Sequence, residues 1–470
     1  MQRFLFLFFL LPSLLLGQSP DQYFEKIRHQ TVSLRAFFSQ MPKGGDLHHH
    51  LAGSIYAEPI LERAIKEDFW VNTRTYGVSP TPGIGPKWVK FSTLTKQNRL
   101  TETKINILKR WSIKDYDPSD HPSDKLFFES FDKFWPAVDG YIKESMIEIR
   151  DRAIKEKVNY IETQFLPVEV DIDIEDLRQQ NGSLREIALQ RDSKKCQQIL
   201  EGMYNQLLER GAVEKVKTFN QNTVQKLHKE AEIDSKDFVM RYQNFVFRFL
   251  APADAFKSTV LAFLSSELSP LVVGVNILAP EDGETSMKDY WLHMQMFKFC
   301  KEKFPAVKTS MHAGELTLGL VPPEELTWHI DEAVRVAGAN RIGHGVDIPY
   351  EKDTYGLMRY MMKNNIAVEI NLSSNEFILK VKEDAHPFLL YREMGVPTVI
   401  ATDDAGVLRT NLTEQYVLLA KRYPSLSYSD IKHLVYNSIT YSFIKEEDVR
   451  KQILTKMKME FEKFEASLPR

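Results

Sequence analysis

Four apolar stretches of this chain run directly into histidine or carboxylate side chains, and this repeated pattern constrains the fold more than any other feature. The stretches end in GDLHHH (45–50), TSMHAGE (309–315), RIGHG (341–345) and VIATDD (399–404). Burying a carboxylate is costly unless a metal or a hydrogen-bond donor receives it, so structural need explains these endings poorly. In a parallel α/β barrel, catalytic groups come from the C-terminal ends of several different strands. The pattern therefore predicts a TIM (β/α)8 barrel.

Eight short apolar or β-branched segments, separated by stretches with helical periodicity, are expected to form the strands of this barrel. They are Gly45 to Leu51, Asn159 to Phe165, Asn244 to Leu250, Val272 to Leu278, Lys308 to His312, Arg341 to Val346, Ala367 to Leu372 and Val396 to Thr402. Eight is the number of strands in a TIM barrel. We assign residues 41–470 to this barrel and its helical insertions.

The connections between the strands are uneven. The insertion between the first two strands contains YGVSPTPGIGPKWVKF (76–91), in which Pro and Gly mark turns. We interpret it as a loop or hairpin over the barrel mouth, either a lid or a passive surface loop. Asp171 to Asp237 is rich in Lys, Glu and Gln and is predicted to be a solvated helical crossover. Residues 18–40 are predicted to form an N-terminal helical extension packed against the barrel; the alternative is an arm that forms a homodimer.

The first 17 residues, MQRFLFLFFLLPSLLLG, carry one positive charge and two apolar runs. This segment is too short for a membrane span and ends at a small residue, so it is expected to be a secretory signal peptide that leaves no stable membrane association after cleavage. The mature chain would then be secreted or periplasmic; a signal anchor is the alternative. The formal net charge of -3 gives no reason to expect a nucleic acid or an anionic membrane as partner.

Cysteine usage excludes two classes of protein. Cys196 and Cys300 are the only cysteines, which rules out a disulfide-rich scaffold and a cysteine-based structural zinc site. We expect them to be buried thiols, with pairing after export as the alternative.

The histidines at the end of the first strand indicate a metal site. Alternate side chains of a strand share a face, so His48 and His50 point together and His49 points away. Two imidazoles on one face, a third His and one carboxylate make a nitrogen and oxygen ligand set suited to zinc or another divalent transition ion. His49 is expected to be a hydrogen-bonded structural residue between the strand and the helix layer.

The order of the motifs HxH, HAGE, GHG and TDD resembles the adenosine deaminase family of metal-dependent hydrolases. The wider sequences MPKGGDLHHHLAGS, VVGVNILAPED, NLSSN and YNSITYSF are most similar to its secreted branch, the adenosine deaminase growth factor group and related bacterial enzymes. The resemblance implies a zinc hydrolase that converts adenosine or 2′-deoxyadenosine to the inosine form and releases ammonia. Two alternatives remain open, namely deamination of adenine or a 5′-modified adenosine, and an extracellular nucleoside-binding, growth-factor-like role.

The resemblance also implies a role for individual residues. One zinc ion per chain would be bound by the four residues that match the family's ligands, which are His48, His50, His312 and Asp403. Glu315 would protonate the purine N1, His344 would orient the attacking water, and Asp403 would also accept a proton from that water. Asp404 would hold the purine through N7. No Lys falls at the end of the fourth strand, where two-metal relatives carry one, so a single metal is favoured.

Two positions depart from the resembled enzymes. Typical cytosolic adenosine deaminases have Asp after the HxHL motif, where it contacts the ribose 5′-hydroxyl, and this chain has Ala52. They also have Gly after the fourth strand, with its backbone near the purine N3, and the matching residue here is Ala279. These changes affect recognition of the ribose, for which Glu281, Asp282 or the segment near Trp88 are the candidate substitutes.

Overall fold

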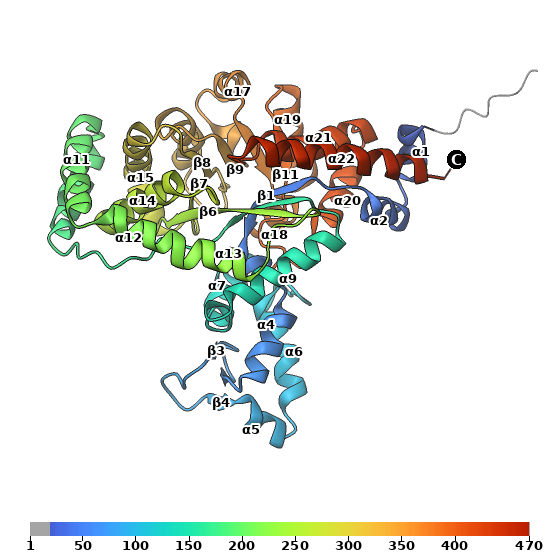
Figure 1. The fold of residues 1–470 in the computed structure, drawn as a ribbon, viewed down its shortest axis with the longest axis horizontal. Coiled ribbons are helices and arrows are strands. Elements are labelled where there is room, and N and C mark those ends of the chain that lie inside the picture. The colour runs from blue at the N-terminus through green and yellow to red at the C-terminus, as the bar shows by residue number, and fades with distance from the viewer. Residues whose placement is uncertain (1–18, 470) are drawn as a thin grey trace, which may run out of the picture.

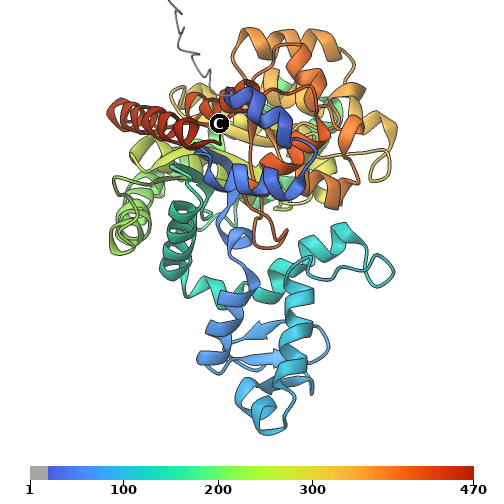
Figure 2. The ribbon, with the colours of Figure 1, turned by 90° about the vertical axis from the view of Figure 1, so that its right-hand side faces the viewer.

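The computed structural model describes residues 19–469, and its centre is a ring of eight parallel strands (Figures 1 and 2). In sheet order the strands are β1 (Gly45–His50), β5 (Tyr160–Gln164), β6 (Val239–Phe247), β7 (Val272–Leu278), β8 (Lys308–Ala313), β9 (Arg341–His344), β10 (Ala367–Ile370) and β11 (Thr398–Ile400). The ring closes where the end of β1 meets the segment after β11, because Asp403 N donates to His48 O at 2.9 Å and His50 N donates to Asp403 O at 3.2 Å. The predicted TIM barrel is confirmed.

All eight predicted strands are present; Val272–Leu278 has the predicted limits, and of the others the third and the eighth differ most. The third runs over Val239–Phe247 rather than Asn244 to Leu250, because the chain turns after Phe247 and Pro252, which has no N–H, opens α14 (Pro252–Leu268). The eighth is limited to Thr398–Ile400, because the backbone leaves the extended conformation and reaches a φ of 61° at Asp403.

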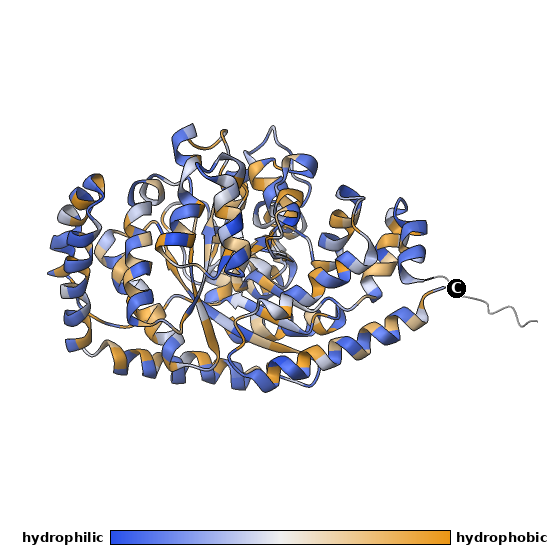
Figure 3. Cartoon of the chain, turned by 90° about the horizontal axis from the view of Figure 1, so that it is seen from above, coloured by the Kyte–Doolittle hydropathy of each residue, from blue (hydrophilic) through white to orange (hydrophobic). Residues whose placement is uncertain are grey.

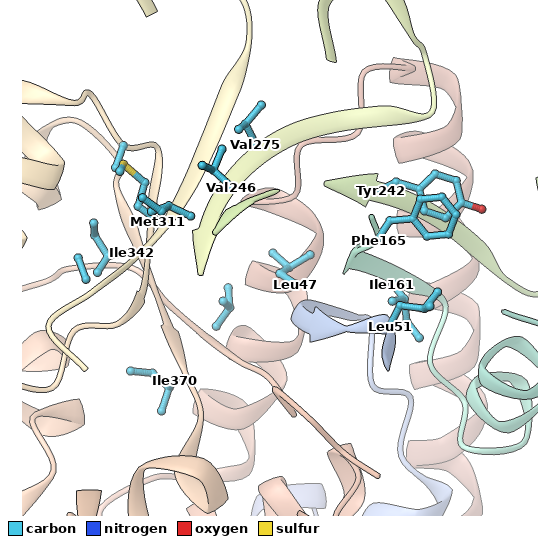
Figure 4. Close-up of a cluster of buried hydrophobic side chains, with 14 of the residues drawn as sticks. Leu47, Leu51, Ile161, Phe165, Tyr242, Val246, Val275, Met311, Ile342 and Ile370 are labelled. Carbon is cyan, nitrogen blue, oxygen red and sulfur yellow. The ribbon is translucent and has the colours of Figure 1, made fainter. Parts of the chain in front are cut away.

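The crossovers after the strands are helical and surround the barrel. They include α9 (Ile142–Lys155), α14, α15 (Glu284–Lys303), α17 (Thr354–Lys363), α18 (Leu372–Leu379), α19 (Phe388–Glu393), α20 (Leu412–Arg422) and α21 (Tyr428–Thr440). In Figure 3 the central strands are mostly orange, and blue segments mark the surrounding helices. Buried apolar side chains of successive strands, such as Ile161, Val246, Met311 and Ile370, form the core shown in Figure 4. Their strand neighbours on the opposite face, such as Glu162, are polar and point into the barrel, where Glu162 pairs with Arg341.

The insertion between β1 and β5 forms a small lobe that projects away from the barrel (Figures 1 and 2). It contains α4 (Ala57–Lys66), α5 (Phe91–Lys96), α6 (Leu100–Trp111) and the antiparallel sheet of β2 (Trp70–Asn72), β3 (Val78–Ser79) and β4 (Trp88–Lys90). The interpretation of residues 76–91 as a cover of the barrel mouth is wrong, because both of their strands pair with β2 instead. The mouth is bordered by α7 (Ser123–Phe134), α8 (Pro136–Asp139) and the start of α9.

The N-terminal and crossover regions agree with their predicted helical character. Helices α1 (Pro20–Ile27) and α2 (Thr31–Gln40) pack on α20, α21 and α22 (Glu447–Ser467), with Phe37 and Phe464 centroids 5.0 Å apart. The crossover after β5 contains α10 (Asn181–Gln190), α11 (Ser193–Glu209), α12 (Ala212–Phe219) and α13 (Lys226–Glu230). Cys196 on α11 and Cys300 on α15 are buried, unpaired thiols, as expected.

The predicted signal peptide lies outside the described residues. Within residues 19–469, none of the helices combines the length and the apolar character that crossing a membrane requires.

Candidate active site

Histidine and aspartate side chains from four parts of the chain converge at the mouth formed by the carboxyl ends of the strands. His48, His312, His344 and Asp403 each offer one ligand atom within 4.8 Å of the others. His50 Nε2 lies 3.1 Å from Asp403 Oδ1 and 3.4 Å from His48 Nε2. The structure therefore brings together the four residues predicted to bind the metal and places His344 beside them.

This group of side chains fits a divalent metal ion. Two ligands of a tetrahedral zinc ion, each about 2.1 Å from it, are roughly 3.4 Å apart, and His48 Nε2 lies 3.3 Å from Asp403 Oδ1. Burial lowers the pKa of His50 and of His312, so both imidazoles are neutral, as metal ligands must be. Burial also disfavours a charged His48, but hydrogen bonds with Asp403 and Glu369 raise its pKa to about 10. The proton on His48 thus balances the charge of Asp403, and a cation bound by the cluster would take its place and leave this imidazole neutral.

Carboxylate and amide side chains inside the barrel fix the orientation of the imidazoles. Glu369 Oε2 lies 2.6 Å from His48 Nδ1, and the same carboxylate pairs with Arg341. Asn276 Oδ1 lies 2.9 Å from His312 Nδ1. Because these acceptors hold a proton on Nδ1, Nε2 of both histidines faces the cluster and is the atom that would bind a metal ion. Sequence reasoning missed Glu369 and Asn276, although a lone polar residue at an inward position of an apolar strand is a usable signal.

His49 lies outside this cluster. It is buried, and its Nδ1 lies 2.9 Å from the hydroxyl oxygen of Thr163 on the neighbouring strand β5. The structure thus agrees with the expected structural role of His49.

A chain of hydrogen bonds determines which nitrogen of His344 carries its proton. Phe388 N donates to His386 Nδ1 at 3.2 Å, so His386 donates through Nε2 to Asn375 Oδ1 at 3.0 Å. The Asn375 amide nitrogen then donates to His344 Nδ1 at 2.9 Å. Burial lowers the pKa of His344 and of His386 to about 3, so each ring holds one proton. His344 therefore presents Nε2–H to the cluster, which makes it a hydrogen-bond donor rather than a metal ligand.

Glu315 lies in the loop after β8 as a buried acid. Its side chain is 8% exposed, and Oε1 has no hydrogen-bond partner within the described part of the chain. Burial raises the pKa of Glu315 well above its usual range, and the Asp403 and Glu281 carboxylates raise it further. Burial therefore favours the protonated form of Glu315, which a general acid requires.

The carboxylate of Glu281 holds the loop that carries Glu315. It accepts hydrogen bonds from Glu315 N at 2.9 Å and Gly314 N at 3.2 Å, and it lies 2.6 Å from His329 Nδ1. Burial opposes its ionisation, but the hydrogen bond with His329 and the charge of Arg248 lower its pKa. Glu281 thus lies behind the loop, so its proposed contact with the ribose is wrong.

Three residues of the site that are not glycine have a positive φ. The values are 96° at Ala279, 70° at His344 and 61° at Asp403. This left-handed region favours glycine, and occupying it costs other residues about 1 to 3 kcal/mol. Strain of this kind concentrates at functional sites. It also explains why Gly suits the position of Ala279 in the resembled enzymes.

Gly53 makes room for Asp404, the residue next to the cluster. A Cβ atom on Gly53 would lie 1.7 Å from Asp404 Oδ1, so any side chain there would displace this carboxylate. Burial raises the pKa of Asp404 well above its usual range, and the adjacent Asp403 adds to the effect. Burial therefore favours the protonated form of Asp404, in which the carboxyl group is able to donate to a ring nitrogen.

A cavity of about 1190 Å³ opens above the cluster. Its inner end is lined by His50, His312, Glu315, His344, Asp403 and Asp404, and Ala52 and Ala279 also line it. Neither Asp282 nor Trp88 is among the residues that line the cavity. Trp88 belongs to β4 of the small lobe. The suggestion that these residues replace the missing ribose contact is therefore wrong.

The fold and the cluster define a TIM-barrel protein with a metal-type site at the carboxyl ends of its strands. Residues 207–459, more than half of the chain, match the sequence model of the family described as adenosine deaminase. The chain belongs to the adenosine deaminase family.

Individual relatives are distant. The adenosine deaminase of Clostridium kluyveri is 30% identical over 161 residues, which are 34% of this chain and 42% of that protein. The chain therefore spans less than half of the length of this curated relative. The N6-methyl-AMP deaminase of Arabidopsis thaliana has a TM-score of 0.56 at 19% identity, covering 90% of this chain and 98% of that one. A zinc-bound amidohydrolase of Burkholderia ambifaria has a TM-score of 0.54 at 16% identity, covering 92% and 95%. These two likenesses describe the fold alone.

Proposed function

We propose that the protein is a zinc-dependent hydrolase that deaminates adenosine or 2′-deoxyadenosine to the inosine form and releases ammonia. The observation that carries this proposal is a buried carboxylic acid, Glu315, which has no hydrogen-bond partner on Oε1 and whose pKa burial raises, beside a cluster of imidazoles and Asp403. A binding protein has no need of a proton donor beside a metal-type site. Membership of the adenosine deaminase family supports the same reaction.

The residues divide the chemistry among them. His48, His50, His312 and Asp403 would hold one zinc ion, which lowers the pKa of water to about 7 and polarises what it contacts. Glu315 donates its proton to the purine N1, which makes C6 a better electrophile. The Nε2–H of His344 stabilises the negative charge that develops as water adds to C6. Protonated Asp404 donates to N7 and fixes the plane of the base.

A screen of aminopurines and aminopyrimidines for ammonia release by the purified, zinc-loaded protein tests this proposal. We expect adenosine and 2′-deoxyadenosine to lose absorbance near the adenosine maximum as the base is deaminated, and a chelator to abolish the change. Adenine as the preferred substrate would support the alternative within the same class. Tight nucleoside binding without any ammonia release would instead support the growth-factor-like role.

We also propose that the mature protein is secreted or periplasmic, on the basis of its first 17 residues. Fractionation of the source cells, followed by N-terminal sequencing of the exported chain, tests this. Recovery of the full-length chain from the cytosol would contradict it.

The hydrogen bonds that orient His344 predict which of two substitutions at Asn375 reduces kcat more. Asn375→Leu leaves Nδ1 of His344 without a donor, and Asn375→Asp offers it an acceptor that draws the proton to Nδ1. We therefore expect kcat to fall about ten- to a hundredfold in the Leu variant and further in the Asp variant. Both variants should retain one zinc per chain. Steady-state kinetics and metal analysis decide this, and an Asp variant as active as the natural protein would contradict the assigned tautomer.

The alanine at position 52 predicts weak dependence on the 5′-hydroxyl of the substrate. A buried Asp facing a substrate without this hydroxyl loses about 1 to 3 kcal/mol of binding free energy, whereas Ala loses none. We expect 5′-deoxyadenosine to be a good substrate of the natural protein and a poor one of Ala52→Asp. The measurement is kcat/KM for both nucleosides in both proteins. Rejection of the deoxy compound by a hundredfold or more in the natural protein would show that another residue reads the 5′ position.

A further inference from the structure

The cavity is larger than the base that the proposed reaction places at the cluster. Its volume of about 1190 Å³ exceeds the roughly 300 to 1000 Å³ of most small-molecule sites. The amino group that is removed must lie at the inner end, beside Glu315 and Asp403. The outer part of the cavity therefore receives the sugar and whatever the sugar carries. The inference below rests on the proposed deamination and concerns this outer part.

Gln164, the last residue of β5, is a polar group without a partner in this cavity. Its side chain is 2% exposed, and neither Nε2 nor Oε1 forms a hydrogen bond with the described residues. It lines the cavity and pairs in register with His50. An amide buried without a partner costs free energy, so such a group in a cavity points to a ligand that both donates and accepts hydrogen bonds. Hydroxyl groups of a sugar do both.

An aromatic face leads from Gln164 to the cavity rim. Phe245, Phe247 and Phe249 alternate along the end of β6 and beyond it, so they lie on one side of the chain. The centroids of Phe245 and Phe247 are 5.1 Å apart, and Phe249 stacks on Phe247 at 4.8 Å with an interplanar angle of 22°. The Phe249 side chain is 54% exposed, and contact between an apolar ring and water is unfavourable. Phe131 and Trp135, from α7 and its end, also line the cavity.

The charged residues of the outer cavity are nearly all acidic. Five carboxylates line it, and none of them takes part in an ion pair within residues 19–469; they are Asp132, Asp139, Glu144, Glu169 and Glu230. Lys143 is the single Lys or Arg among the described lining residues. This distribution repels a phosphate group on the sugar and leaves an uncharged group unaffected.

We propose that this outer cavity binds adenosine-type nucleosides whose sugar hydroxyl groups contact Gln164 and whose 5′ position carries an uncharged, apolar substituent packed on the Phe245, Phe247 and Phe249 face. Such a substrate satisfies the unpartnered amide, covers the exposed ring of Phe249 and adds no charge beside the carboxylates. It differs in class from a nucleoside monophosphate, the substrate named for the Arabidopsis protein of the same fold.

The first test compares kcat/KM for adenosine, 5′-deoxy-5′-(benzylthio)adenosine and AMP. We expect the benzylthio compound to match or exceed adenosine and AMP to be at least tenfold worse, with a smaller penalty in 1 M salt, where the screening length is about 3 Å. Phe249→Ala should lower the ratio of benzylthio compound to adenosine about tenfold, because half of the stacked face is lost. The control Leu189→Ala, at an 89% exposed residue of α10, should leave this ratio unchanged.

The second test concerns Gln164. Methionine has a similar length and no hydrogen-bonding groups of comparable strength, so Gln164→Met should reduce the preference for adenosine over 2′,3′-dideoxyadenosine roughly tenfold. Thermal unfolding of the variant verifies that the fold is retained. An unchanged preference in a folded variant would overturn the role of Gln164.

Turnover of AMP equal to that of adenosine, or a benzylthio compound more than tenfold worse than adenosine, would overturn the proposed ligand class. Calorimetric binding of the corresponding inosine products gives the same comparison without turnover. If no compound is deaminated, the proposed reaction fails, and the order of product affinities still decides the nature of the outer cavity.

Discussion

Glu315→Gln should lower kcat for adenosine by about 10² to 10⁴ while leaving the fold and the metal content unchanged. Glutamine fills the same space and still accepts from its surroundings, but it has no acidic proton to deliver to N1. Among the described residues, Glu315 is the only glutamate at the inner end of the cavity, and burial raises its pKa. Because Asp404 is assigned to N7 rather than N1, the loss should be large.

The measurement is single-turnover and steady-state deamination of adenosine, together with metal analysis and thermal unfolding. Glu332→Gln is a matched control, because Glu332 is a half-buried glutamate whose pKa burial also raises, and it lies on η4 (Glu332–Val336) away from the cavity. A loss of less than tenfold in the Glu315 variant, with the control fully active, would show that another group protonates the ring.

His312→Ala should abolish turnover and reduce the zinc content well below one ion per chain. Removing one of four ligands leaves the ion with an incomplete coordination shell, and Glu369 holds the remaining His48 in a fixed orientation. The free energy of unfolding should fall as well, because a metal that binds only the native state stabilises it.

Zinc analysis after gel filtration and chemical denaturation with and without added zinc provide the test. His49→Ala is the control, since His49 lies next to two ligands in sequence and contacts Thr163 instead of the cluster. We expect the His49 variant to lose stability yet retain one zinc ion per chain. Full zinc occupancy in the His312 variant would contradict its assignment as a ligand.

The sequence predicted the barrel and the convergence of the site because both depend on where polar residues interrupt apolar strands. His48, His312 and His344 lie near the carboxyl ends of such strands and Asp403 follows one. Parallel strands bring their carboxyl ends to one mouth. The partners that orient them were not predictable in the same way. His386 acts on His344 through Asn375, and Glu281 acts through backbone amides. Neither connection produces a recognisable sequence pattern.

The small lobe was misplaced for a related reason. Pro and Gly in residues 76–91 correctly indicate turns, but turn residues do not show which strand the flanking segments will pair with. Pairing with β2 is a tertiary contact, and it takes this segment away from the mouth. Likewise, the positive φ of His344 and Asp403 could not be predicted from the sequence, because His and Asp usually avoid this conformation. The geometry of the site imposes it.

The ring of strands closes through the backbone of the same residues that make up the cluster, since Asp403 exchanges hydrogen bonds with His48 and His50. A ribosome that is still synthesising the chain has released the first strand long before it adds Asp403. The site is therefore incomplete until Asp403 has been added, and binding by all four ligands requires that the first and last strands have joined. A bound ion would then stabilise the contact between the end of β1 and the segment after β11, because its ligands come from both. Amide hydrogen exchange at His50 and Asp403 should accordingly slow on zinc addition more than exchange within the pairing of β6 with β7.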